Sequence, residues 1–192
     1  MNLFDRIWER VGRHNRAVLE PTLELAIEIA REGREGHRIG TIFTVGDADA
    51  VLARSRPLIL DPLAGHPEEL RRITDANLRG TIKELAQLDG AFVISDEGVV
   101  LSACRYLDAT AHDTDLPLGL GSRHFAAASI SKVTDALGIV VSESALVRVF
   151  DDGNLIAEVL PELWLLSRHN VQLRAPFSED HFHDMAVLVK QQ

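Results

Sequence analysis

The chain has 192 residues, a formal net charge of −9 and an apolar fraction of 46%. This length and composition suit one folded domain with its own core and exclude a largely disordered chain. The negative charge argues against broad nucleic-acid binding, and no run approaches the ~20 apolar residues of a membrane span. One cysteine, Cys104, permits no internal disulfide, so we expect a cytoplasmic protein that binds neither membrane nor nucleic acid.

Helical patterns open the chain. Apolar residues recur every three or four positions from residue 3 to residue 30, and Pro21 predicts a division into two helices, with Pro21 in the first turn of the second. The β-branched run 39–46 predicts a buried strand, followed by a short helix that Asp47 caps. Residues 67–87 carry a moderate apolar stripe that predicts a longer helix.

The second half alternates strands and a helix. Two apolar runs flank the turn signal "SDEG" and predict a β-hairpin over 88–107. Residues 123–137 suit a helix, and three further strands are expected over 138–144, 145–153 and 154–160. This order of elements predicts an α/β fold: one domain with a mixed central β-sheet flanked by helices.

One glycine-flanked stretch, "LGLGSRHF", places Ser122, Arg123 and His124 in a row at the start of the expected helix. Backbone N–H groups at a helix N-terminus attract phosphate, and a guanidinium grips two phosphate oxygens at once. These residues are therefore candidates for an anion site. A helix capped by Ser122 beside a solvated arginine is the alternative that the residue types leave open.

Carboxylates stand at the ends of two expected strands. Asp89 precedes the first strand of the hairpin, and Ser142 and Glu143 end the strand that begins at residue 138. A carboxylate at a strand edge is suited to holding a metal ion or orienting a hydroxyl group, and ligands of α/β sheets usually lie beyond strand ends. Solvated turns explain the same residues, because Asp-Gly is a common turn dipeptide.

In this order and spacing, "LDGA", "GSRHFAAASIS" with "VTDA", and "GIVVSES" resemble the catalytic domain of the diadenylate cyclases, a family typified by the DNA-integrity scanning proteins. The resemblance implies that the chain condenses two ATP molecules into cyclic di-AMP and releases pyrophosphate, with Mg²⁺ or Mn²⁺ as cofactor. It also implies a homo-oligomer in which two domains meet face to face, so that the 3′ hydroxyl of one ATP attacks the α-phosphate of the other.

The resemblance assigns roles to residues of this chain. Asp89, Arg123 and His124 are the implied catalytic residues, and Asp89 and Glu143 the implied metal ligands. The implied nucleotide-binding residues are Gly90, Ala91, Leu107, Gly121, Ser122, Arg123, His124, Ser142 and Glu143. We expect an N-terminal helix (1–22), a diadenylate cyclase-like domain (23–160) and a C-terminal extension that packs on the domain (161–192).

The sequence departs from the family pattern at one position that bears on activity. Phe125 stands where the family usually has a second arginine. Lys132 or Arg105 is a possible replacement for the missing cation. The departure leaves open a second hypothesis, in which the chain is a catalytically impaired regulatory module that binds ATP or cyclic di-AMP. Leu88, in the place of a histidine found in membrane-linked members, favours the soluble branch of the family.

A further metal-binding pattern lies in the tail. His181 and His183 would share one face of a strand, and with Asp184 they are a candidate transition-metal site. Solvated tail residues are the alternative interpretation.

Overall fold

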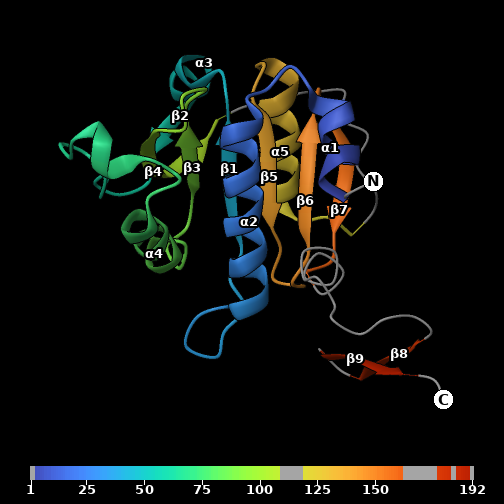
Figure 1. The fold of residues 1–192 in the computed structure, drawn as a ribbon. Coiled ribbons are helices and arrows are strands. Elements are labelled where there is room, and N and C mark those ends of the chain that lie inside the picture. The colour runs from blue at the N-terminus through green and yellow to red at the C-terminus, as the bar shows by residue number, and fades with distance from the viewer. Residues whose placement is uncertain (1–2, 109–118, 162–176, 183–184, 191–192) are drawn as a thin grey trace.

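A mixed sheet of seven strands runs through the computed structural model, which describes residues 3–108, 119–161, 177–182 and 185–190 (Figure 1). The strands lie in the order β2-β4-β3-β1-β5-β6-β7. The central strand β1 pairs in parallel with β3 and antiparallel with β5, so the expected mixed α/β architecture is confirmed. The strands are β1 (Thr41–Val45), β2 (Ser55–Pro57), β3 (Ala91–Ile94), β4 (Val100–Leu107), β5 (Leu137–Val141), β6 (Val147–Asp151) and β7 (Asn154–Val159).

Helices cover both faces of this sheet (Figure 1). Helix α2 lies on one face and α5 on the other, and neighbouring residues of one strand point to opposite faces. Phe43 and Ile139 therefore join the core beneath α2, whereas Ile42 and Val140 join the core beneath α5. Burial on both faces explains why the central strands are apolar almost throughout. The helices are α1 (Leu3–Val11), α2 (Arg16–Glu32), α3 (Ala48–Ala53), the 3₁₀ turn η1 (Glu68–Arg71), α4 (Ala76–Leu85) and α5 (Ser122–Val133).

Two short strands of the tail, β8 (Phe177–Phe182) and β9 (Met185–Lys190), pair antiparallel in a small sheet of their own. His181 lies in β8, but His183 and Asp184 lie outside the described residues, so the metal site suggested for the tail stays a prediction. The expected division of the chain into three regions stays a prediction as well. Among the helices that the structure describes, none is long and apolar enough to cross a bilayer.

The expected division of the N-terminal helices at Pro21 is wrong. The first helix ends at Val11, and α2 begins after Asn15, whose side chain accepts a hydrogen bond from the Ala17 N–H at 3.0 Å. Pro21 lies inside α2, where it removes one backbone hydrogen bond. The capping side chain of Asn15, rather than the proline, sets the start of this helix.

The expected helix over 67–87 is also corrected. It is divided into η1 and α4, because the segment between them pairs with the β3–β4 turn: the Ile73 N–H donates to the Gly98 carbonyl at 2.8 Å. Asp75 then caps α4 by accepting from the Leu78 N–H at 2.9 Å.

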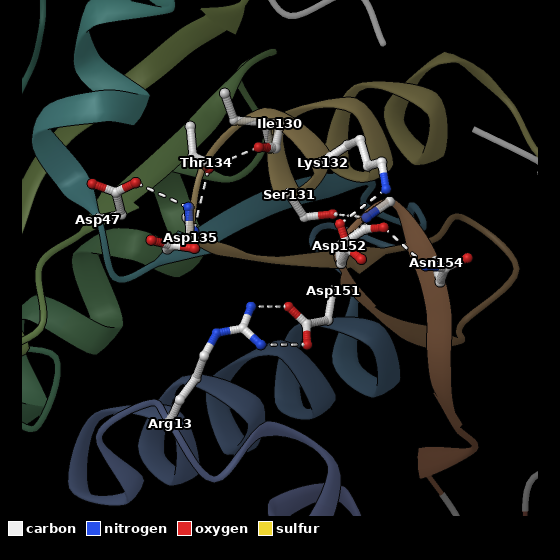
Figure 2. A network of polar contacts seen from close by, with 12 residues as sticks. Arg13, Asp47, Ile130, Ser131, Lys132, Thr134, Asp135, Asp151, Asp152 and Asn154 are labelled. Atoms are coloured by element: carbon white, nitrogen blue, oxygen red, sulfur yellow. Dashed lines mark hydrogen bonds and ion pairs between the residues drawn. The ribbon is translucent and has the colours of Figure 1, made fainter. Parts of the chain in front are cut away.

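The ends of two other helices differ from expectation. Helix α5 ends at Val133 and not near Leu137, which begins β5. Asp47 does stand before α3, but its carboxylate does not cap that helix. It accepts instead from the Asp135 N–H at 2.9 Å and thereby ties the β1–α3 turn to the α5–β5 turn (Figure 2).

Polar contacts join loops at this end of the sheet (Figure 2). Arg13, between α1 and α2, forms two hydrogen bonds with Asp151 at the end of β6, one of them 3.0 Å long. Lys132, in the last turn of α5, binds Asp152 at 3.0 Å. These contacts fix the β6–β7 turn to the helices on both faces of the sheet. Lys132 is thereby bound at the C-terminal end of α5, far from the N-terminal end of that helix.

Small residues let α5 approach the sheet closely. A methyl group added at Gly138 in β5 would lie 2.7 Å from the carbonyl oxygen of Ala127 in α5, closer than van der Waals contact allows. Ala127 and Ala128 are both fully buried. This close packing holds the first turn of α5 beside the end of β5 and the start of β1.

We expect Gly138→Ala to destabilise the fold by about 1–3 kcal/mol, because the atom that the methyl group meets belongs to the helix backbone. Urea unfolding of the variant measures this free energy. Gly80→Ala in α4 is the matched control: a methyl group there meets nothing within 4 Å, so it should stabilise the helix by roughly 0.5–1 kcal/mol. Equal stability of Gly138→Ala and wild type would contradict the close packing described here.

Candidate functional site

Three chain segments bring Asp89, Arg123 and Glu143 together at one edge of the sheet. Asp89 precedes β3, Glu143 follows β5, and these strand ends meet because β1 runs parallel to β3 and antiparallel to β5. Nη1 of Arg123 donates to Oε1 of Glu143 at 2.8 Å, and Nη2 of Arg123 lies 3.6 Å from Oδ1 of Asp89. The Asp89 and Glu143 side chains are 79% and 64% exposed. One guanidinium thus stands between two solvent-facing carboxylates.

An apolar cavity of about 240 Å³ lies on one side of Arg123, between β4 and α5. Asp89 and Gly90 lie at its edge, together with Ser122 and Arg123. Its apolar lining comes from Ile42, Leu58, Tyr106, Leu107, Phe125 and Ala126. Such a cavity suits a flat, largely apolar group that has a charged neighbour at one end.

A polar cavity of about 300 Å³ lies on the other side of Arg123, between the start of α5 and the end of β5. Ser122 and Arg123 border both cavities, so a ligand with an apolar end and an anionic end can span the two. The other residues of the polar cavity are Gly119, Gly121, His124, Val140, Val141, Ser142, Glu143 and Ser144.

The start of α5 faces the polar cavity without a capping side chain. The residue at the cap position is Gly121, and Ser122 is the first residue of the helix. The alternative interpretation of Ser122 as an ordinary helix cap is therefore wrong. The partial positive charge of a helix N-terminus, next to the Arg123 guanidinium, favours an anion in this cavity.

His124 lies beneath the first turn of α5, with its ring edge toward Phe150. Its Nε2 is 3.1 Å from Nη1 of Arg148, and its Nδ1 is buried without a hydrogen-bond partner among the described residues. Burial, and then the nearby charges of Arg148 and Arg123, lower the pKa of His124 below its usual value, which favours the neutral ring. Nδ1 does not face open solvent in this arrangement, and the assignment of His124 to phosphate binding stays a prediction.

The two residues after Asp89 differ in position. Gly90 borders the apolar cavity, and its φ of +109° together with its close approach to the backbone of Cys104 and Arg105 accounts for the glycine. Ala91 is fully buried in the core beneath α5. Its buried side chain leaves only the backbone to approach a nucleotide, and the assignment of Ala91 to nucleotide binding stays a prediction.

Sequence reasoning missed two residues of the site. Gly40, just before β1, lies under Arg123: a methyl group there would lie 2.6 Å from Nη1 of Arg123 and 3.3 Å from Cγ of Glu143. Ser144 borders the polar cavity, and its hydroxyl is 2.8 Å from that of Ser142. Nothing in the local pattern around Gly40 marks it, because its importance depends on packing across the sheet.

Neither of the cations expected to replace a second arginine is free to do so. Lys132 binds Asp152, about 13 Å along the helix axis from Arg123. Arg105 borders the apolar cavity, but it donates to the Ser55 hydroxyl and to the Ser55 carbonyl, both at 2.8 Å.

Asp89 and Glu143 offer the donor set of a hard cation. No group of three or more His, Cys, Asp or Glu side chains arranged to hold a metal ion occurs in the part of the chain that the structure describes. Mg²⁺, however, is usually bound by one or two carboxylates together with phosphate oxygens of the substrate. Two exposed carboxylates beside an anion cavity fit that mode of binding.

Two solved structures share this fold. DacA from Staphylococcus aureus, crystallised as a double mutant, superimposes with a TM-score of 0.50 at 21% identity, over 80% of this chain and 95% of DacA. A hypothetical membrane spanning protein from Bacillus cereus has a TM-score of 0.53 at 22% identity, over 75% of this chain and 64% of its own. At these identities the likeness defines the fold class alone.

The family follows from the sequence comparisons. The DAC family model, described as "DisA bacterial checkpoint controller nucleotide-binding", matches residues 28–155, and the chain belongs to this family. A diadenylate cyclase from Methanocaldococcus jannaschii is 48% identical over 161 residues, which cover 83% of this chain and 51% of the relative. A diadenylate cyclase from Haloferax volcanii is 42% identical over 154 residues, covering 80% and 56%. The chain thus spans about half the length of these curated relatives.

We expect Gly40→Ala to displace the Arg123 guanidinium from Glu143 and to weaken the binding of a phosphate-bearing ligand by about tenfold, the value of one charged hydrogen bond. Calorimetric titration with ATP measures the affinity. Because the methyl group meets the end of a flexible side chain, the unfolding midpoint should stay close to that of wild type. Unchanged affinity would show that Gly40 does not position Arg123.

Proposed function

We propose that this chain is a diadenylate cyclase, which condenses two ATP molecules into cyclic di-AMP with release of pyrophosphate. The observation that carries the proposal is the position of Arg123, between Asp89 and Glu143 at the junction of an apolar and a polar cavity. Membership of the DAC family and two relatives named diadenylate cyclase support it.

In the proposed mode of binding, adenine occupies the apolar cavity against Leu107 and Phe125. The triphosphate extends past Arg123 into the polar cavity, toward Ser122 and Ser142. Arg123 binds the phosphate oxygens and neutralises the charge that develops on them. Phosphoryl transfer depends chiefly on such positioning and charge neutralisation, which this site offers.

In the proposed chemistry, Asp89 accepts the hydrogen bond of a 3′ hydroxyl and takes up its proton. The hydroxyl oxygen forms a bond to the α-phosphorus of the other ATP as the bond to the β-phosphate breaks, and pyrophosphate leaves. Repeating the step with the roles of the two nucleotides exchanged closes the ring. Asp89 and Glu143 would hold Mg²⁺ or Mn²⁺, which supplies positive charge to the phosphates when bound.

The reaction also implies a homo-oligomer. In the proposed mode of binding, one copy of the site holds one ATP. The reaction requires two ATP molecules, with a hydroxyl group of each near a phosphate of the other. A second copy that faces the first provides the second ATP. The single cysteine fits a cytoplasmic protein, which stays a prediction.

A second candidate function is a regulatory module that binds ATP or cyclic di-AMP without making it. Phe125 is the observation that favours it, because the side chain extends the apolar wall of the cavity where the family usually has a cation. Asp89 and Glu143 oppose it, since a site that has lost its catalytic task usually loses the catalytic carboxylate first. Incubation of the wild-type chain with ATP and Mn²⁺, followed by chromatography, separates the two. Bound ATP without any product would favour the regulatory module.

We expect Asp89→Asn to lower the rate of cyclic di-AMP formation by about a hundredfold or more, because the amide cannot take up the hydroxyl proton. ATP binding should be retained, since Arg123 keeps its contact with Glu143. Asp49→Asn, an exposed carboxylate of α3, is the matched control and should have wild-type turnover. Unchanged turnover of Asp89→Asn would exclude the role assigned to Asp89.

A further inference from the structure

A chain of charged contacts leads from β7 to His124. Glu158 in β7 accepts from Nε of Arg148 in β6 at 2.6 Å, and Nη1 of Arg148 lies 3.1 Å from Nε2 of His124. Arg148 and Glu158 are cross-strand partners in the sheet, so the register of β6 and β7 aligns them. The Arg148 side chain is 12% exposed, and its contacts with Glu158 and His124 restrict the position of the guanidinium.

This contact fixes the tautomer of His124. A guanidinium has N–H donors and no acceptor, so Nε2 of His124 must accept and carries no hydrogen. The neutral ring then bears its hydrogen on Nδ1. Nδ1 is buried, and the Gly121 carbonyl lies close enough to the ring to raise its pKa. The hydrogen on Nδ1 therefore faces the backbone at the start of α5, which borders the polar cavity.

We propose that Arg148 is a positioning residue of the site: held by Glu158, it keeps His124 neutral with its hydrogen on Nδ1, beneath the phosphate side of the cavity. The proposal rests on the proposed function, because the ring supports the first turn of α5, which borders the cavity proposed for the triphosphate. A protonated or inverted ring would turn a hydrogen on Nε2 against the Arg148 guanidinium and would disturb the first turn of α5. Arg148 thus acts through His124 and not by contact with the nucleotide.

Arg148 also helps to explain why residue 125 is a phenylalanine in this chain. The family usually has a second arginine there, on α5 itself, whereas the side chain at this position borders the apolar cavity in this chain. A second guanidinium nevertheless lies near the start of α5, and it comes from β6. This arrangement leaves residue 125 free to be apolar while a second positive charge remains close to the phosphate side.

The charges around His124 give the proposal a signature in the pKa of the ring. Arg123 on α5 and Arg148 on β6 lower the pKa of His124, whereas Glu158 on β7 and the Gly121 carbonyl raise it. Removing Arg148 takes away one lowering charge, so the pKa rises and the ring gains its proton at higher pH. Removing the charge of Glu158 has the opposite effect and lowers the pKa of His124. Opposite shifts would show that both charges act on the ring, and the pH profile of the rate then shows whether the ring serves the reaction.

Nitrogen NMR of the full chain, labelled with ¹⁵N-histidine, tests the tautomer directly. The His124 signals are assigned by their loss in His124→Gln. In wild type we expect an unprotonated Nε2 and a protonated Nδ1, with the ring neutral to lower pH than an ordinary histidine. We expect a raised pKa for His124 in Arg148→Met, a lowered one in Glu158→Gln, and a value near wild type in Arg148→Lys, which keeps the charge.

The rate of cyclic di-AMP formation is then measured between about pH 5 and 8. The neutral ring is the working form, so activity falls as the pH drops through its pKa. Arg148→Met should move this fall in rate to higher pH and lower the rate in that pH range by about tenfold. Glu158→Gln should move the fall to lower pH. Arg148→Lys should keep most of the wild-type rate.

Hydrogen on Nε2 in wild type, or a His124 pKa and tautomer unchanged in Arg148→Met, would overturn the proposal. Shifts of the same sign in Arg148→Met and Glu158→Gln would overturn it too. If wild type forms no cyclic di-AMP, the proposed function fails, and the NMR signals still decide whether Arg148 orients His124.

Discussion

The site depends on one guanidinium that stands between two exposed carboxylates. Ion pairs in water contribute little to stability, so the contacts of Arg123 with Asp89 and Glu143 are not what keeps the three segments together. The sheet register and the close packing of α5 on β5 do that. Gly40 lets the Arg123 guanidinium lie close to the backbone, because a methyl group there would lie 2.6 Å from Nη1. The contacts of Arg123 are therefore exposed, weak ion pairs and not structural ties.

The two ends of the sheet use acidic residues in different ways. At the end shown in Figure 2, Asp151 is 11% exposed and forms two hydrogen bonds with Arg13, and Asp47 accepts from a backbone N–H. These carboxylates have fixed partners that hold loops together. At the other end, Asp89 and Glu143 face solvent on either side of Arg123, and Asp89 also accepts from the Gly90 N–H at 3.0 Å. Exposed carboxylates with spare lone pairs are available to a metal ion or a hydroxyl, and those with fixed partners are not.

The sequence predicted the strands better than the helix ends, and the reason is physical. Strands buried on both faces, such as β1 and β5, are buried throughout, rich in apolar and β-branched residues, and end at turn signals. Helix ends depended on whether one side chain formed a cap: Asn15 and Asp75 did, and Asp47 did not. The grouping of the site motifs was predictable because strand ends at one edge of a sheet converge. The roles of Gly40 and Arg148 were not predictable, because each acts through a neighbouring residue on another strand or helix.

The charge of the site bears on how a polyanion binds to an acidic chain. Arg123, Asp89 and Glu143 carry one positive and two negative charges, so by themselves they repel a triphosphate. The start of α5 and the buried Arg148 add positive potential on the phosphate side, although Glu158 offsets part of it. These groups supply less positive charge than the triphosphate and the two carboxylates require, and the net charge of the chain, −9, adds to the repulsion. A divalent cation bound with the nucleotide supplies the missing positive charge. The two carboxylates that repel the triphosphate are the groups that attract such a cation. The acidic site is thus consistent with binding ATP as its metal complex, and with discrimination against ATP without metal.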